Sequence, residues 1–119
     1  MNAPVPVMPV ANTELPIVRF GDVVLDIGKR ELVRKGRPVA IEYKALNLLI
    51  YLMINREHAV CRYELQRALW DGRPLSSTVL ARCVMKARRA AGDDGTAQRV
   101  IKTISRYGYR FVAALVTTA

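Results

Sequence analysis

Cationic side chains recur at helical spacing between Ser76 and Gly95. Arg82, Lys86 and Arg89 follow one another at intervals of four and three residues, so a helix would bring them onto one side. Guanidinium and ammonium groups in such a row donate hydrogen bonds to phosphates and to the acceptor edges of bases. The pattern therefore indicates binding of a polyanion. The apolar residues that fall on the opposite side are Leu80, Val84, Ala87 and Ala91.

A second pattern lies near the end of the chain, where residues 100–112 are V-I-K-T-I-S-R-Y-G-Y-R-F-V. Apolar and polar residues alternate, which predicts two strands with one face toward the core. We expect Gly108 to permit a tight turn, because glycine adopts backbone conformations that strain other residues. The predicted basic ribbon directs Ile101, Ile104, Tyr109 and Phe111 to the core, and Lys102, Ser105, Arg106 and Arg110 outward or to its tip.

The sequence lacks the residue sets of common enzymes. It has one histidine, no Gly-rich phosphate loop and no nucleophile elbow, so we expect no catalysis and no cofactor. His58 and Cys61 lack the two further ligands of a zinc site, so no metal is expected. Cys83 falls at the flank of the apolar helix face, which favours a buried structural thiol over a redox role.

The charge of the chain also favours a polyanionic partner. The 119 residues carry a net charge of +9, with an isoelectric point near 10.2. Residues 1–27 have a balance of −2, residues 28–77 of +5 and residues 78–119 of +6. A solubilising basic surface is the alternative interpretation of charge alone. The longest apolar run, about ten residues that include Asn47, is too short to span a membrane. With no signal peptide pattern, the expected compartment is the cytoplasm.

The order of elements predicts one α+β domain. The predicted boundaries are a disordered Pro-rich tail at 1–16, the domain at 17–115 and a C-terminal tail at 116–119. We expect an antiparallel sheet of three or four strands from Ile17 to Ile41, followed by helices at 43–55 and 61–70. A loop at 71–75 leads to a third helix, which is capped by Ser76 or Ser77 and ends near Gly92, and the ribbon follows. Cys61 and Glu64 have the spacing of a capping box, with cysteine a poor acceptor.

This order resembles the OmpR/PhoB-type winged-helix DNA-binding domain of bacterial transcriptional regulators. The resemblance covers about residues 18–113. Its carriers are F-G-D-V-V-L-D, Y-K-A-L-N-L-L, A-V-C-R-Y-E-L-Q-R-A-L-W, L-A-R-C-V-M-K-A-R-R-A-A-G-D-D and I-K-T-I-S-R-Y-G-Y-R-F-V. It implies a winged helix-turn-helix, with an N-terminal antiparallel sheet, three helices and a C-terminal hairpin, the wing, beside the recognition helix.

The resemblance also implies site residues. The positions at which the family faces DNA are occupied here by Thr78, Val79, Ala81, Arg82, Met85, Lys86 and Arg89. Arg88 falls where a basic residue of the family often meets phosphate. In the wing, Thr103 and Ser105 fall at positions that contact the DNA backbone, and Arg106 falls at the tip. Asp71, Gly72, Arg73, Pro74 and Leu75 correspond to the connection that can meet RNA polymerase. Ala81 and Met85 stand where many members carry polar groups. Ser105-Arg106 replaces the commoner Arg-Gly order.

The sequence thus predicts a sequence-specific regulator that binds double-stranded DNA, with the helix in the major groove and the wing on the minor groove or backbone. The resemblance further implies contact with RNA polymerase. It also implies homodimeric or tandem binding on nucleoid DNA in a bacterial cytoplasm. The alternative is a protein-interaction module on the same fold, a co-regulator or anti-activator that binds RNA polymerase or another regulator. The 119 residues have no place for a receiver domain, which leaves a stand-alone regulator or a piece of a longer one.

Overall fold

Short strands with alternating apolar residues form the N-terminal sheet. The computed structural model describes residues 16–118. Val18 and Phe20 in β1, and Val23 and Leu25 in β2, face the core, because side chains in a strand alternate between its two faces. The antiparallel sheet has the order β4-β3-β2-β1-β8. Its strands are β1 (Ile17–Phe20), β2 (Val23–Asp26), β3 (Glu31–Arg34), β4 (Arg37–Pro38) and β8 (Val116–Thr118).

Strand β8 corrects the predicted C-terminal tail. Residues 116–118 pair antiparallel with β1, with Val116 opposite Arg19 and Thr118 opposite Ile17. Three residues are too few to show a sequence period, and their pairing partner lies about a hundred residues away, so the strand arises from tertiary contact. The predicted tail at 1–16 lies outside the described residues except for Pro16, whose carbonyl accepts a hydrogen bond from the Ile27 amide (3.5 Å).

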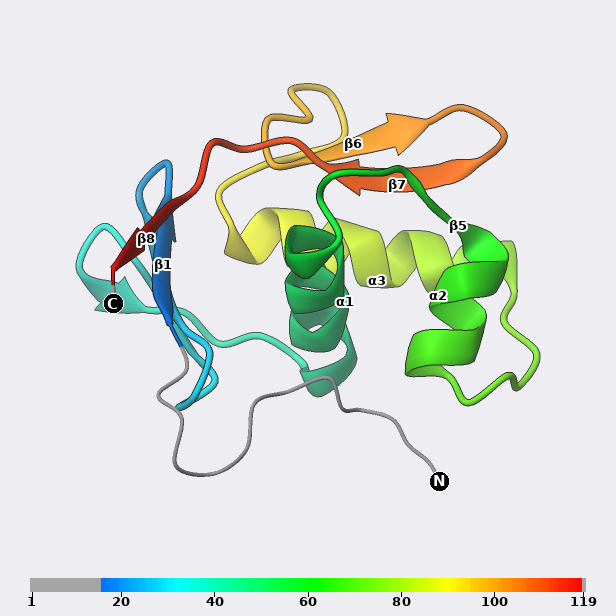
Figure 1. The fold of residues 1–119 in the computed structure, drawn as a ribbon, viewed down its shortest axis with the longest axis horizontal. Coiled ribbons are helices and arrows are strands. Elements are labelled where there is room, and N and C mark those ends of the chain that lie inside the picture. The colour runs from blue at the N-terminus through cyan, green and yellow to red at the C-terminus, as the bar shows by residue number, and fades with distance from the viewer. Residues whose placement is uncertain (1–15, 119) are drawn as a thin grey trace.

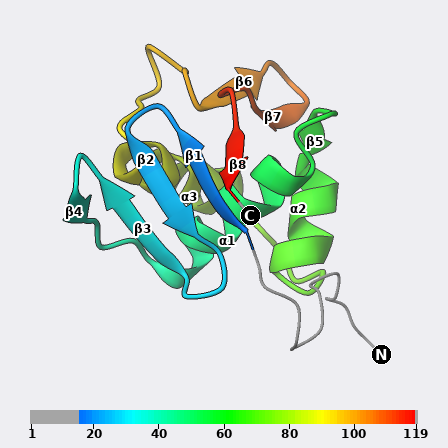
Figure 2. The ribbon, with the colours of Figure 1, turned by 60° about the vertical axis from the view of Figure 1, so that its left-hand side comes forward.

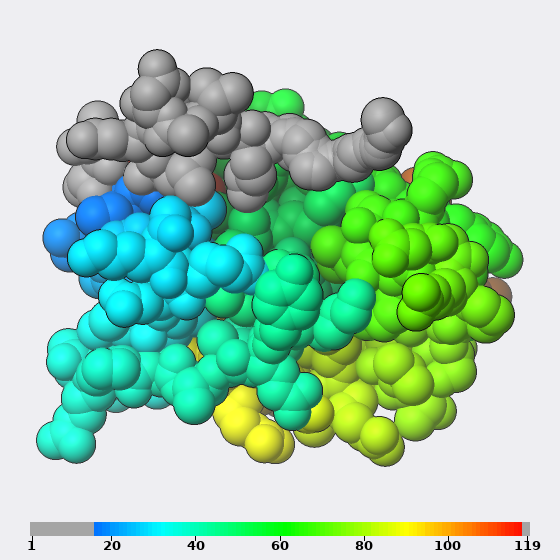
Figure 3. All heavy atoms as spheres, turned by 90° about the horizontal axis from the view of Figure 1, so that it is seen from below, coloured from blue at the N-terminus to red at the C-terminus, as the bar shows by residue number. Residues whose placement is uncertain are grey.

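The three predicted helices are confirmed. They are α1 (Tyr43–Ile54), α2 (Arg62–Leu69) and α3 (Ser77–Ala90). Leu48, Leu49 and Leu52 of α1 are fully buried, since this helix is surrounded by the other elements. Figure 1 shows α1 in the middle of the molecule, with the N-terminal sheet at the left, α2 at the right and β6 and β7 above. Seen from below, the N-terminal sheet and α2 lie on opposite sides (Figure 3).

The residues that precede α3 and α2 differ in whether their side chains cap the helix. Ser76 Oγ accepts a hydrogen bond from the Val79 amide at 3.1 Å, so Ser76 caps α3 as expected. Cys61 makes no side-chain cap at α2. Glu64, the other half of the expected capping box, instead accepts a hydrogen bond from the Tyr51 hydroxyl at 2.6 Å. Burial and then this hydrogen bond raise the pKa of Tyr51 to about 12.

The predicted C-terminal ribbon gains a third strand. The order is β5-β7-β6, where β5 is Val60–Cys61, β6 is Ile101–Ile104 and β7 is Gly108–Phe111. The rings of Phe20 and Phe111 meet edge to face at 5.1 Å between centroids and join the two sheets across the core. Both sheets and the helices between them are visible in Figure 2. No helix within residues 16–118 has the length and apolar character to cross a membrane.

Gly108 has a different role from the predicted one. It lies in β7 opposite Cys61, and its φ is not positive. A Cβ at this position would lie 1.9 Å from the Val60 carbonyl oxygen, so close approach of β5 requires the glycine. The left-handed residue of the turn is Arg106, with φ of 60°.

Candidate nucleic-acid interface

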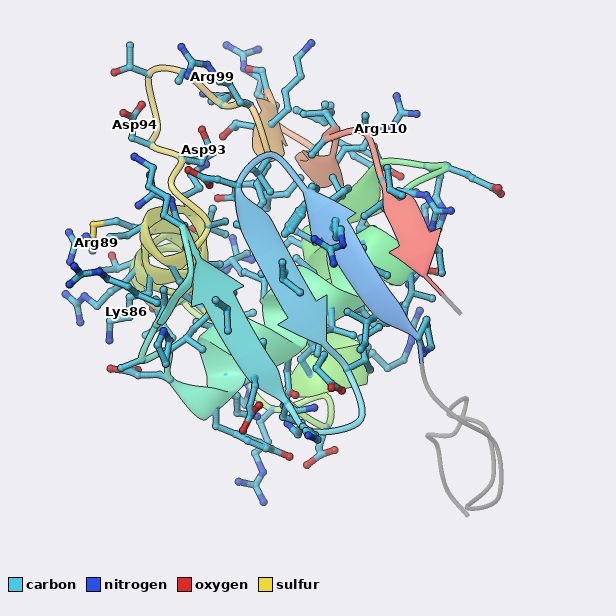
Figure 4. The ribbon with its side chains drawn as sticks, turned by 90° about the vertical axis from the view of Figure 1, so that its left-hand side faces the viewer. Lys86, Arg89, Asp93, Asp94, Arg99 and Arg110 are labelled. Atoms are coloured by element: carbon cyan, nitrogen blue, oxygen red, sulfur yellow. The ribbon has the colours of Figure 1, made fainter. Side chains whose placement is uncertain are left out.

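Helix α3 buries one face and presents the other. Leu80, Val84 and Ala87 are at most 3% exposed and pack into the core that α1 shares. The opposite face points away from the body of the molecule, and Figure 4 shows Lys86 and Arg89 projecting from it. The predicted division of this helix is confirmed. Its exposed side chains include Thr78, Val79, Ala81, Arg82, Met85 and Arg89.

The cations of this face differ in their freedom. Lys86 is half-buried, and its Nζ lies 2.8 Å from Glu42 Oε2 at the start of α1. Arg82 and Arg89 form no ion pair with any residue in 16–118. Two guanidinium groups are therefore available to an incoming anion, while Lys86 is partly neutralised.

Arg88 lies in the protein rather than on the exposed face. It is 8% exposed, its Nε donates to the Ile101 carbonyl at 3.1 Å, and its Nη2 donates to Thr103 Oγ1 at 2.8 Å. The expected phosphate contact does not match this position. One residue along a helix turns the side chain by about 100°, which moves Arg88 from the face of Arg89 toward β6. Arg88 holds the wing against α3.

Asp93 fixes the loop between α3 and the wing. Its carboxylate accepts hydrogen bonds from the amides of residues 99–101 at 2.8–3.1 Å and is 7% exposed. Burial raises the pKa of this carboxyl, but the backbone N–H groups together outweigh burial and leave the pKa below its ordinary value. Asp94, in contrast, is exposed, and its carboxylate accepts hydrogen bonds from the amides of Thr96 and Ala97.

The wing ends in an exposed turn. Ser105, Arg106 and Tyr107 lie between β6 and β7, and all three are exposed. Arg106 is at the tip, as predicted. The Tyr107 carbonyl accepts a hydrogen bond from the Arg62 amide at 3.4 Å, which connects the turn to the start of α2. Thr103 is exposed, but its hydroxyl oxygen already accepts the bond from Arg88.

A hollow of about 560 Å³ joins the starts of α2 and α3 to the wing. Arg62 spans it, since Nη1 donates to Ser77 Oγ at 3.0 Å and Nη2 to the Leu75 carbonyl at 2.6 Å. Tyr63 and Tyr107 stand at its rim, 73% and 54% exposed. The sequence-based prediction missed these three residues, because α2 was not expected to face the wing. The exposed aromatics beside arginines were the available signal.

The loop of residues 71–75 is exposed except at its end. Asp71 and Gly72 adopt positive φ, and the Gly72 and Arg73 amides bond back to the carbonyls of Gln66 and Trp70. Leu75 is 6% exposed and belongs to the core. Leu75 is therefore an anchor of the loop, so the predicted contact surface is confined to residues 71–74.

Cys83 is buried at the edge of this site, as the helical pattern predicted. It is 7% exposed, and burial raises the pKa of its thiol to about 11. The thiol is protonated at neutral pH and is a poor nucleophile. Cys83 therefore contributes to the packing of the core.

The hairpin beside a basic recognition helix, with the N-terminal sheet behind, defines a winged helix-turn-helix protein. The family described as "Transcriptional regulatory protein, C terminal" matches residues 36–111. The chain belongs to this family, the OmpR/PhoB-type C-terminal DNA-binding domains of transcriptional regulators.

Individual relatives agree with this assignment. The chain is 27% identical over 96 residues to the transcriptional activator protein IrlR of Burkholderia pseudomallei, covering 81% of this chain and 42% of IrlR. It is 31% identical to the structure of DrrB, an OmpR/PhoB homologue from Thermotoga maritima, with a TM-score of 0.71 over 79% of this chain and 43% of DrrB. The Klebsiella pneumoniae RstA DNA-binding domain, solved with the RstA box, shares the fold at 23% identity, with a TM-score of 0.70 over 82% of this chain and 96% of that domain. The chain spans less than half of IrlR and DrrB.

Proposed function

We propose that the chain binds specific sites in double-stranded DNA and regulates transcription. Helix α3 enters the major groove, and the wing turn at residues 105–107 contacts the adjacent minor groove or backbone. The observation that carries the proposal is the exposed pair Arg82 and Arg89 on a helix whose opposite face is fixed in the core. Arginine in the major groove forms bidentate hydrogen bonds with guanine, the commonest specific contact.

The remaining site residues fit supporting roles in this complex. Thr78 and Lys86 flank the arginines on α3, and Ser105 and Arg106 form the wing turn. Arg88 acts through Thr103 and the Ile101 carbonyl, since its guanidinium is already bonded to both. The helix and the wing are thereby held as one rigid surface that reads bases with the helix and follows phosphates with the wing.

The test is selection from a random duplex pool at low and near-physiological salt. We expect an enriched motif that survives the higher salt, because base contacts add to the phosphate term. Arg82→Ala and Arg89→Ala should each weaken binding to the selected duplex by about five- to 150-fold, since one bidentate pair discriminates by about 1–3 kcal/mol. Arg19→Ala is the matched control, an exposed arginine on the outer face of β1. Equal loss in all three variants, or no enriched motif, would contradict the proposal.

The same selection addresses assembly on DNA. Two copies of the motif at a fixed separation of about 10 base pairs, or a multiple of this, would indicate homodimeric or tandem binding. We place this activity in a bacterial cytoplasm, on nucleoid DNA. A single isolated motif would indicate that one copy of the chain is sufficient.

We further propose that the loop at residues 71–74 contacts RNA polymerase. Its exposed backbone is held by the bonds to Gln66 and Trp70, so it presents a defined shape. Arg73→Ala should reduce transcription from a promoter that carries the selected site while DNA affinity stays unchanged. Loss of DNA affinity in Arg73→Ala would instead place the loop on the DNA.

The alternative is a protein-interaction module that binds RNA polymerase or another regulator. Val79 and Met85 of α3 are 46% and 44% exposed, so this helix face also offers apolar contacts to a protein partner. Selective co-purification of one protein, together with no salt-sensitive duplex binding, would favour this module over the DNA-binding regulator.

A further inference from the structure

Three side chains form an apolar strip along the exposed face of α3. Thr78, Ala81 and Met85 lie at positions i, i+3 and i+7, which a helix places on one side. All three are exposed. A shallow hollow follows them and is lined by Ser77, Thr78, Ala81, Arg82 and Met85. We call this set the methyl strip, since it presents the Thr78 methyl, the Ala81 methyl and the Met85 side chain.

Cations border the methyl strip. Arg82 and Arg89 lie beside it on α3, without an ion pair in the part of the chain that the structure describes. On its other side, Arg88 and Thr103 join α3 to the wing. An occupant of the strip therefore meets the two unpaired guanidinium groups of Arg82 and Arg89 along one side, so a surface with apolar groups beside anionic groups fits it.

The major groove of DNA has this composition. Phosphates line its edges, and the 5-methyl group of thymine is its one apolar feature. An isolated strip of three side chains is small for a stable protein interface, which buries about 800 Å² on each partner. The strip spans seven residues from Thr78 to Met85, or about 10 Å at 1.5 Å per residue. This length matches about three base steps of 3.4 Å.

We propose that the methyl strip selects thymine, with Met85 and Ala81 packed against 5-methyl groups at one to three adjacent base pairs. The inference rests on the proposed DNA-binding function and names the bases that the site prefers. The apolar side chains complement the 5-methyl group and offer no hydrogen-bond partner to the N4 amino group of cytosine or to O6 and N7 of guanine, which disfavours a G·C pair at the same positions. Arg82 and Arg89 then recognise flanking guanines or phosphates.

The experiment uses the selected duplex with each thymine replaced in turn by deoxyuridine. Deoxyuridine keeps the base pair and the O4 acceptor and removes only the 5-methyl group. We expect binding to weaken about fourfold at each thymine that faces the strip, and to be unchanged at other thymines. Met85→Ala should bind the thymine duplex more weakly and lose the sensitivity to uracil at the thymine that Met85 covers.

Ile54→Ala is the matched control. Ile54 is 48% exposed, similar to Met85 at 44%, but lies at the end of α1 instead of on α3. This variant should keep the wild-type response to uracil. Thermal unfolding of each variant tests whether the fold is intact. We expect both variants to remain folded, because each replaces an exposed side chain.

The outcomes separate the inference from the function on which it rests. Selective duplex binding that no uracil substitution weakens would overturn the thymine preference and leave the DNA-binding function standing. Uracil sensitivity that persists unchanged at every thymine in Met85→Ala would overturn the role of the strip. No selective duplex binding at all would overturn the DNA-binding function itself.

Discussion

Neighbouring arginines on α3 have different physical roles. Arg88→Ala leaves the Ile101 carbonyl and Thr103 Oγ1 without their donor, and we expect it to lower the free energy of unfolding by about 1–3 kcal/mol. Arg89→Ala removes an exposed side chain and should leave that free energy unchanged while it weakens DNA binding. Urea unfolding and duplex titration of both variants measure the two effects. Equal stability of the two variants would show that the Arg88 bridge contributes nothing.

Glu42 competes with DNA for Lys86. Because its carboxylate lies 2.8 Å from Lys86 Nζ and is well exposed, Glu42→Gln should free the ammonium group and remove a negative charge beside the site. An exposed ion pair is worth about 0.2–1 kcal/mol, so duplex affinity should rise by up to about fivefold. Glu57→Gln, an exposed acid beyond the other end of α1, is the control. Unchanged or weaker binding in Glu42→Gln would mean that Lys86 does not approach DNA.

Asp93 should make the stability of the protein depend on acid pH. The folded-state pKa lies below the unfolded value, so the stabilising contribution is present above about pH 4 and is lost as the pH falls through the folded pKa. Asp93→Asn should be less stable at neutral pH and lose less stability on acidification. Thermal unfolding of both proteins from neutral to acid pH measures this. Parallel pH curves would contradict the assigned role of the carboxylate.

Single residues of the site were predictable where helical phase decides their direction. Arg82, Met85 and Arg89 face outward as the apolar positions of α3 require. The pairing of Lys86 with Glu42 was not predictable, because 44 residues separate the partners. The buried position of Arg88 was not predictable, because the pattern of α3 does not identify the β6 carbonyl that its guanidinium meets.

Among the elements, the pairing of β5 with β7 depends on one glycine. Gly108→Ala places a Cβ 1.9 Å from the Val60 carbonyl oxygen, so the strands must separate. We expect a loss of about 3 kcal/mol in the free energy of unfolding, and weaker DNA binding because the wing shifts away from α2. Denaturant unfolding and duplex titration check both.

Gly95→Ala provides the comparison for this variant. A Cβ at Gly95 meets only Arg88 Nη1 at 3.7 Å, an ordinary contact, and the φ of this residue is not positive. The stability and the DNA affinity of Gly95→Ala should therefore be close to those of the wild-type protein. If Gly108→Ala were equally stable, the close approach of β5 would not be required.

Elements with a continuous buried face were predictable, and two of the short strands were not. The apolar period of α1 and α3 and the alternation in β1 and β2 identified these elements directly, since each buries a continuous face. Strands β5 and β8 have two and three residues, which show no period. Strand β5 pairs with β7 and strand β8 pairs with β1 because β7 and β1 have unpaired edges once the core has assembled.

At the scale of the whole molecule, the charge determines how binding responds to salt. The net charge of +9 is spread widely, but only cations that reach phosphates release counterions. Besides the buried Arg88, four cations belong to α3 and the wing turn, namely Arg82, Lys86, Arg89 and Arg106. Arg110, in contrast, lies across the molecule from Lys86 and Arg89 (Figure 4), and its Nε donates to the Arg56 carbonyl at 3.1 Å. The number of interface cations, rather than the net charge, should determine the salt dependence.

The plot of log affinity against log salt concentration should therefore have a slope between about −2 and −4, at about −0.9 for each phosphate contact, because Lys86 and Arg106 meet phosphates and Arg82 and Arg89 meet guanines or phosphates. Arg106→Ala should make this slope shallower by about 1 and weaken binding to all duplexes alike, because a wing contact to phosphate carries no sequence information. Arg19→Ala, on the outer face of the N-terminal sheet, should leave the slope unchanged. Fluorescence anisotropy with selected and unrelated duplexes between about 50 and 200 mM salt measures both quantities. A slope that becomes equally shallow in Arg19→Ala would mean that the diffuse charge of the whole molecule, and not the wing, holds the DNA.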